Sequence, residues 1–165
     1  MIRKLDPEKD RGCFIEGWLW ESSAPRWFKD ADRVFGPATF EDFLESSREP
    51  NRATFAIFDD RLAGLIIFTL RGSSVEVDLM ARPKVPRGTI FTGASVLRDR
   101  IFNDLPIQGL YVWLPRKNYP TIRLCSMLGF RETGMTMIRG TYRARVIEWV
   151  HLSIPREVKA AQLAA

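Results

Sequence analysis

The chain has 165 residues, of which 45% are hydrophobic and 27% charged, with a formal net charge of +5 at pH 7. These values fit one globular domain with its own core, and no apolar run approaches the roughly 20 residues of a membrane helix. Two cysteines are too few for a disulfide framework, and the N-terminus lacks the apolar core of a secretion signal, so we expect a cytoplasmic protein. The charge permits anionic partners such as nucleotide cofactors or tRNA without requiring them.

The first fifty residues predict a short strand and two helices. Residues 3–5 are expected to form the strand, and residues 10–28 hold apolar side chains at helical spacing. A second helix is expected to begin after Thr39, which stands at an N-cap position with Asp42 three residues later. The apolar faces of these two helices are expected to pack against a sheet.

The rest of the chain supplies that sheet. Apolar and β-branched runs bounded by turn residues predict six further strands, and two segments with helical periodicity separate them. In chain order we expect strands at 54–58, 62–70 and 75–81, a helix at about 88–103, a strand at 110–114, a helix opened by Asn118, and strands around 135–138 and 146–154.

The predicted order is therefore β-α-α-β-β-β-α-β-α-β-β. Such an order favours an α+β domain, a mixed and mostly antiparallel sheet flanked by helices. We expect a single domain over residues 1–155. The Ala-rich residues 156–165 are expected to form a frayed or disordered tail.

One segment carries most of the functional information. It reads NYPTIRLCSMLGF, from Asn118 to Phe130, and follows the short apolar strand LYVWL. An Asn that opens a helix ending in Leu-Gly-Phe resembles the signature of the GNAT superfamily of N-acetyltransferases. The predicted element order is also that of the GNAT fold, so the resemblance to a divergent member spans nearly the whole chain.

The resemblance implies an enzyme that transfers an acetyl group from acetyl-coenzyme A to a primary amine. The acceptor would be a small molecule, a protein or an aminoacyl-tRNA, and the resemblance allows a homodimer. It also implies that Asn118 lies near the pantetheine arm of the cofactor.

A loop before the predicted 88–103 helix matches the family's phosphate-binding motif in part. The family pattern is Arg-Gly-x-Gly-x-Gly/Ala; here Arg87 and Gly88 match its start, while Ile90 and Thr92 replace the later small residues. Backbone N–H groups at a helix N-terminus bind phosphate whatever the side chains are. We therefore expect Arg87, Gly88 and Thr89 to contact the cofactor.

Two more cations, Arg82 and Lys84, flank that loop and could pair with phosphates. The alternative interpretation of the whole stretch is a solvated basic loop before an ordinary helix.

The strand at 75–81 is expected to border the reaction. In the family this strand carries a bulge and diverges from the next strand, and the pantetheine arm pairs with its backbone, here that of Leu79, Met80 and Ala81. Glu76 and Asp78 lie on one face of the strand. Either carboxylate could remove the proton of an ammonium acceptor; Glu76 is the first choice. A solvent-facing pair of acids is the alternative.

Cys125 occupies the position at which family members commonly carry a Tyr. That Tyr donates a proton to the departing thiolate, whereas a thiol is a weak donor. Three interpretations stay open: Cys125 is a proton donor in the catalytic site, a bystander while another group assists the thiolate, or an apolar filler of the helix's inner face.

Two functional alternatives remain beside the amine acetyltransferase. The substituted loop and the missing Tyr favour a GNAT-fold binding or structural module that has lost catalysis. The net charge and a basic run at Arg139, Arg143 and Arg145 allow an enzyme acting on aminoacyl-tRNA. Aromatic residues near the first helix are expected in the acceptor site or in the core: Trp18, Trp20, Trp27 and Phe28.

Overall fold

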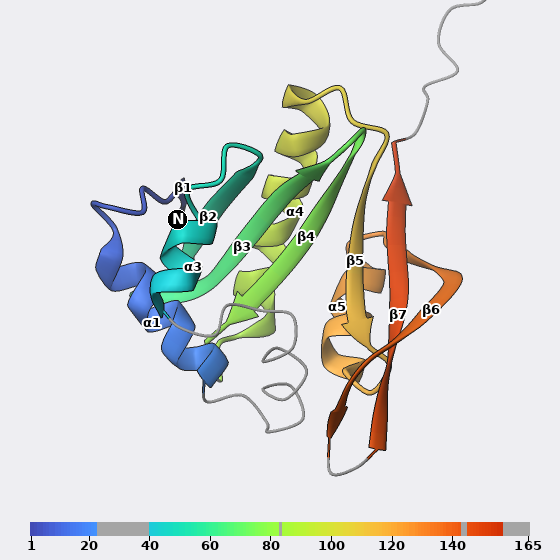
Figure 1. Ribbon diagram of the computed structural model, residues 1–165. Coiled ribbons are helices and arrows are strands. Elements are labelled where there is room, and N and C mark those ends of the chain that lie inside the picture. The colour runs from blue at the N-terminus through green and yellow to red at the C-terminus, as the bar shows by residue number, and fades with distance from the viewer. Residues whose placement is uncertain (23–39, 83, 143–144, 157–165) are drawn as a thin grey trace, which may run out of the picture.

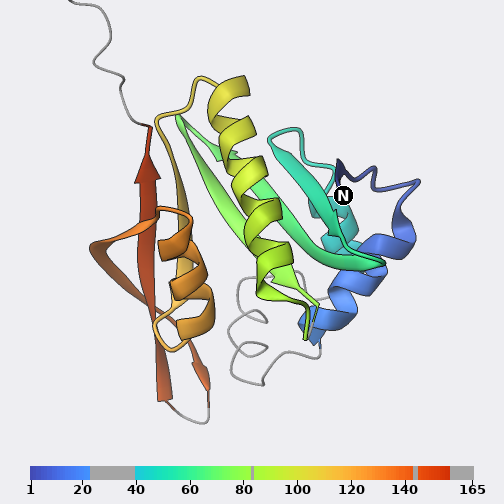
Figure 2. The same cartoon turned by 180° about the vertical axis from the view of Figure 1, so that it is seen from behind.

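The computed structural model describes residues 1–22, 40–82, 84–142 and 145–156. The described strands form one seven-stranded sheet with the order β1-β2-β3-β4-β5-β7-β6. Neighbouring strands are antiparallel throughout, except that β4 and β5 run parallel. Helices α1 and α3 cover one face (Figure 1), and α4 and α5 cover the other (Figure 2).

The observed element order confirms the predicted one, and the α+β class is confirmed with it. The bounds in chain order are β1 (Ile2–Lys4), α1 (Arg11–Ser22), α3 (Phe40–Ser46), β2 (Arg52–Phe58), β3 (Leu62–Arg71), β4 (Ser74–Ala81), α4 (Arg87–Asp104), β5 (Gly109–Pro115), α5 (Tyr119–Met127), β6 (Arg131–Tyr142) and β7 (Arg145–Pro155). Thr39, the predicted cap of α3, lies outside the described residues.

The sheet separates two apolar cores. The larger core joins α4 and α5 to strands on both halves of the sheet and includes Leu97, Leu110 and Leu152. The smaller core joins α1 and α3 to β2 and β3 around Phe14 and Leu65. Strand β3 is buried from its first residue through Thr69, as expected of a strand covered on both faces.

Strands β4 and β5 pair over a short stretch and then diverge. Residues 74–76 pair with residues 109–111, and the last pair is Glu76 with Tyr111. Beyond it the two described strands separate toward the end of β4 (Figure 1), while β4 stays paired with β3 and β5 with β7. The predicted divergence is present, but the expected bulge is absent, because the β3–β4 register is continuous over the whole of β4.

Small residues let α4 approach the sheet closely. A Cβ on Gly93 would lie 2.5 Å from the Cδ1 of Ile57, and one on Gly64 would lie 2.9 Å from the Cδ1 of Ile90. Ile90, which replaces a small residue of the family loop, thus packs in the space that Gly64 leaves on β3. The substitution that weakens the sequence motif is accommodated beneath the helix.

The Leu-Gly-Phe end of α5 is a helix C-cap. Gly129 has a φ of +94°, a conformation that favours glycine, and the N–H of Phe130 donates to the carbonyl of Cys125 at 3.0 Å. Phe130 is buried in the larger core. Arg98 of α4 donates to the carbonyl of Leu128 at 2.7 Å, which holds this end of α5 against α4.

Arg156, the first residue of the predicted tail, contacts the domain. Its guanidinium donates to the carbonyls of Phe102 and Leu105, and its N–H donates to the carbonyl of Gln108.

Candidate active site

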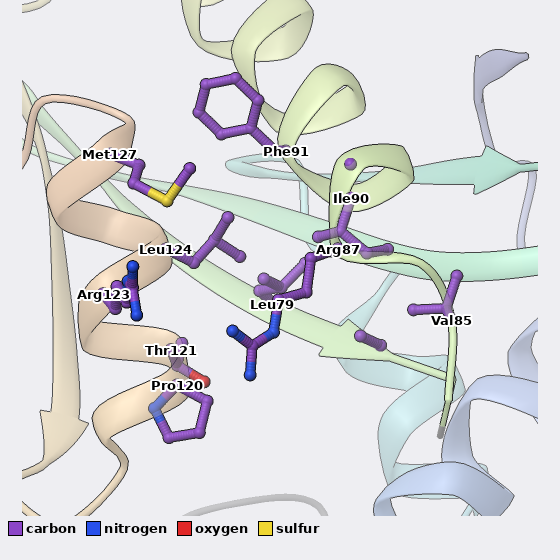
Figure 3. Close-up of a pocket in the computed structure, with 12 residues that line it drawn as sticks. Leu79, Val85, Arg87, Ile90, Phe91, Pro120, Thr121, Arg123, Leu124 and Met127 are labelled. Atoms are coloured by element: carbon purple, nitrogen blue, oxygen red, sulfur yellow. The ribbon is translucent and has the colours of Figure 1, made fainter.

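A pocket of about 430 Å³ lies where β4 has left β5, between the N-terminal turn of α4 and one face of α5 (Figure 3). Most of its lining is apolar, two of its side chains are guanidinium groups, and none of its twelve described lining residues is acidic. The lining residues are Leu79, Ala81, Val85, Arg87, Gly88, Ile90, Phe91, Pro120, Thr121, Arg123, Leu124 and Met127.

The N-terminus of α4 presents backbone donors at this pocket. Pro86 occupies the N-cap position and supplies no side-chain hydrogen bond to the helix. The N–H of Thr89 is bonded to the carbonyl of Pro86 at 3.0 Å. Because this helix end has no side-chain cap, the other N–H groups of its first turn and the positive end of the helix dipole favour an anion here.

Two arginines from different helices flank that helix end. Arg87 opens α4, and Arg123 lies on α5; both side chains reach the gap between the helices in Figure 3. Arg123 is missing from the residues predicted by sequence. The signal for it was available, because residues 120, 123, 124 and 127 follow the three-and-four spacing of one helix face.

Arg82, expected beside the phosphates, is committed elsewhere. Its guanidinium donates to Asp59 at 2.9 Å and to the carbonyl of Leu62 at 3.1 Å. These bonds tie the loop before α4 to the turn between β2 and β3. Lys84 is exposed and has a φ of +62°, an uncommon conformation for a lysine. The two bonds of Arg82 favour a supporting role in the loop over a role as a phosphate ligand.

Strand β4 borders the pocket. Leu79 and Ala81 line it, whereas the side chain of Met80 points to the other face and packs on the α1 core. Since β5 has diverged here, the β5-facing edge of this part of β4 has no partner in β5. Main-chain groups along that edge are positioned to bond an extended ligand.

Asn118 lies at the N-cap of α5, but its side chain makes no capping hydrogen bond. Its backbone carbonyl instead accepts hydrogen bonds from the N–H groups of Thr121 and Ile122, at 3.1 and 3.0 Å. The helix therefore begins after Asn118 as predicted, and backbone hydrogen bonds close its first turn. Asn118 is half-buried and lies just outside the described lining, next to Pro120 and Thr121.

Glu76 lies at the fork, on the sheet face opposite α4 and α5. Its carboxylate pairs with the Nε of Arg71 at 3.3 Å, and its side chain is 24% exposed. Asp78 is exposed and two residues farther from the fork. Glu76 is thus the acid next to the point where β4 and β5 separate, which favours it over Asp78 as the predicted base.

Cys125 is placed in the larger core. Its side chain is 8% exposed and is not among the lining residues of the pocket. Burial raises the pKa of the Cys125 thiol to about 12, so the thiol stays protonated at neutral pH. This position favours the interpretation of Cys125 as an apolar filler, because the sulfur faces neither the pocket nor solvent.

His151 has a structural contact on the opposite face of the sheet. Its Nδ1 lies 2.9 Å from the hydroxyl of Thr133, its ring packs on Trp113, and burial lowers its pKa. The described residues contain no cluster of metal-ligating side chains, and none of the described helices is both long and apolar enough to span a bilayer. Several sequence expectations concern positions outside the described set: the side chains of Trp18, Trp20, Arg139 and Arg145, and residues Trp27, Phe28 and Arg143.

The arrangement is similar to that of solved N-acetyltransferases. Ribosomal-protein-S18-alanine N-acetyltransferase from Escherichia coli superposes with a TM-score of 0.75 at 14% identity, covering 100% of this chain and 99% of that one. Spermidine N-acetyltransferase from Vibrio cholerae, in complex with CoA and spermine, gives 0.71 at 16% identity over 94% of each chain. A dodecameric structure of the spermidine enzyme gives 0.73 at 16% identity over 98% of each chain.

The chain has the GNAT fold. No family model matches the sequence, and no curated protein matches it significantly. The similarity is therefore one of structure, with the sequence far diverged. Within the GNAT fold, the pocket at the β4–β5 fork is formed by the two segments that carry the sequence resemblance, the loop at Arg87 and the helix after Asn118.

Proposed function

We propose that this protein is an acetyl-coenzyme A-dependent N-acetyltransferase that acts on a primary amine. The observation that carries the proposal is the pocket at the fork, which combines an uncapped helix N-terminus, two arginines and an apolar channel along an unpaired strand edge. The neighbouring structures support it, since they are amine N-acetyltransferases and one of them holds CoA.

The described residues fit coenzyme A in charge and in shape. Arg87, Arg123 and the first turn of α4 would hold the phosphates through charge-assisted and backbone hydrogen bonds. The uncharged pantetheine arm would lie along Leu79 and Ala81, against Leu124. The absence of acidic lining residues favours an anionic ligand at this end of the pocket.

Acetyl-coenzyme A supplies an activated acyl group, a thioester that a neutral amine attacks. The work left to the chain is to bind, orient and deprotonate. The β4 edge orients the ligand next to the fork, and Glu76 lies at the fork to take a proton from the ammonium form of the acceptor, directly or through water. Cys125 takes no part in this scheme, because its thiol is buried in the core.

Calorimetric titration with coenzyme A and acetyl-coenzyme A tests the proposal. We expect micromolar binding by the wild type and a loss of affinity of about tenfold or more in Arg87→Ala and in Arg123→Ala, the usual size for a lost charged hydrogen bond. Arg100→Ala is the matched control, since Arg100 lies on the same helix as Arg87 but pairs with Asp104 on the exposed surface.

Three results separate the alternatives. Unchanged affinity in Arg87→Ala would contradict the phosphate site, and no binding at millimolar cofactor would contradict the proposal as a whole. Tight binding without acetyl transfer to any member of a broad amine panel would favour the binding module that has lost catalysis. Steeply salt-dependent binding of RNA would favour the aminoacyl-tRNA acceptor.

A further inference from the structure

The scheme above leaves the departing sulfur without a proton donor. When the bond between the acetyl carbon and sulfur breaks, its electron pair stays on sulfur, and a thiolate departs less readily than a thiol. The helix position expected to supply the proton holds Cys125, whose side chain is buried away from the pocket. The proton would then come from water or from another side chain near the fork.

Tyr111 is a hydroxyl-bearing residue at the fork. It is the partner of Glu76 in the last pair that joins β4 to β5, so the two side chains lie on the same face of the sheet. Its ring packs against His151, with 5.3 Å between centroids, and His151 in turn contacts Trp113. The register places Tyr111 in the last residue pair before the strands separate, and the ring contact holds its side chain against His151 of β7.

The surroundings keep the phenol protonated. Burial, followed by the charge of Glu76, raises the pKa of Tyr111 above its ordinary value near 10; Asp78 acts in the same direction and Arg71 opposes it. On β7 the facing titratable group is His151, whose pKa is lowered by burial and which is therefore neutral at neutral pH. A phenol in this setting is a hydrogen-bond donor throughout the neutral and mildly alkaline range.

We propose that Tyr111 is a catalytic residue that donates its proton to the sulfur of coenzyme A, in the place of the missing tyrosine of α5. The proposal rests on the proposed function. Tyr111 lies on strand β5 and on the sheet face opposite α5, the helix that carries the family position, so the proton would arrive from the side on which Glu76 lies.

Atoms and charge balance in this proton transfer. The amine nitrogen forms a bond to the acetyl carbon, the carbon–sulfur bond breaks, and its electron pair goes to sulfur. Tyr111 gives its proton to that sulfur, which leaves as the thiol. The proton that the amine loses passes to Glu76 or water and returns to the phenolate, so the ammonium acceptor and the thioester become an amide, a thiol and one released proton.

A binding measurement tests the contact without any acceptor. Coenzyme A has a thiol that is largely ionised at pH 9, because thiol pKa values lie near 8.5. We expect Tyr111→Phe to bind coenzyme A about tenfold more weakly than the wild type at pH 9, since a hydrogen bond to a charged sulfur is lost. Affinity for acetyl-coenzyme A, which has no ionisable thiol, should stay unchanged and shows that the fold is intact.

Turnover supplies the second readout. With spermidine and an Ala-initiated peptide as acceptors, Tyr111→Phe should lower kcat about a hundredfold, a common size for lost acid catalysis. It should also abolish the fall of kcat at high pH that follows ionisation of the phenol. Tyr119→Phe is the matched control, because Tyr119 is 69% exposed and lies on α5, whereas Tyr111 lies on β5 in the last β4–β5 pair.

The outcomes distinguish the two proposals. Equal affinity of Tyr111→Phe and wild type for coenzyme A at pH 9 would overturn the role of Tyr111 whether or not an acceptor is found. So would a kcat within twofold of the wild type with the alkaline limb retained. If Tyr111→Phe binds coenzyme A more weakly but the wild type acetylates neither acceptor, the two proposals part. The weaker binding would support the contact between Tyr111 and sulfur, and the missing activity would count against the proposed transferase.

Discussion

At the scale of single residues, the position that departs most from the family pattern has become part of the core. Cys125 is buried between α5 and the sheet, and the raised pKa of its thiol is a consequence of that burial. The sequence alone left three roles open for it, because a helical residue near a site faces either the ligand or the core, and one position in a pattern does not separate the two. Arg123, on the same helix, went unpredicted although residues 120, 123, 124 and 127 follow the spacing of one helix face.

Cys125→Ala separates these roles by its effect on stability as a function of pH. The folded thiol has a pKa of about 12, against 9.0 for an ordinary cysteine, so the unfolded state loses its proton first. The free energy of unfolding should therefore hold below about pH 9 and fall as the pH rises toward 12. Denaturant unfolding at pH 8 and pH 10 should show a smaller loss in Cys125→Ala than in the wild type.

The same variant should keep the wild-type rate of acetyl transfer within about twofold, because the sulfur does not line the pocket. A loss of kcat comparable to that expected of an acid catalyst, about a hundredfold, would return Cys125 to the catalytic site.

At the scale of elements, side-chain spacing together with the turn residues between the apolar runs was enough to predict the order of the described helices and strands. The close packing of α4 on the sheet was not predictable in this way. It depends on pairs such as Gly93 with Ile57, which are far apart in sequence and meet only when the helix is laid on β2.

Gly93→Ala should lower the free energy of unfolding by about 1–3 kcal/mol, the usual cost of overpacking. Its Cβ would meet the Cδ1, Cγ1 and Cγ2 of Ile57, a β-branched side chain that is 2% exposed and has little room to move. Chemical denaturation of a double-mutant cycle checks this, because the cost should shrink in an Ile57→Ala background.

Gly12→Ala is the matched control for that cycle, since Gly12 lies in α1 and an added Cβ would meet nothing within 4 Å. It should be neutral or stabilise by up to about 1 kcal/mol. Equal costs at the two glycines would argue against the packing explanation.

At the scale of the whole molecule, the sheet consists of two halves joined by three residue pairs at the fork. Local patterns predicted both halves, and the family resemblance implied their divergence. The continuous β3–β4 register shows that β4 diverges from β5 without a bulge. The presence or absence of a bulge depends on pairing between strands, which the sequence of β4 alone does not specify.

Coenzyme A should protect the edge of β4 that β5 leaves unpaired. We expect amide hydrogen exchange among Leu79, Met80 and Ala81 to slow on binding at the N–H groups that face the fork, while exchange in β2 changes little. Exchange measured by NMR with and without coenzyme A checks this. Unchanged exchange along β4 would show that the pantetheine arm does not pair with this strand.

The bond between Arg82 and Asp59 has a consequence for how this protein varies through evolution. The two residues are 23 positions apart and belong to different connections, yet one guanidinium joins the turn after β2 to the loop that leads into α4. Loss of Arg82 would remove the bond that joins the two connections, whereas loss of Asp59 would leave Arg82 its bond to the carbonyl of Leu62. Correlated substitution at these two positions would reflect this structural contact. It would be easy to mistake for a shared catalytic or binding role.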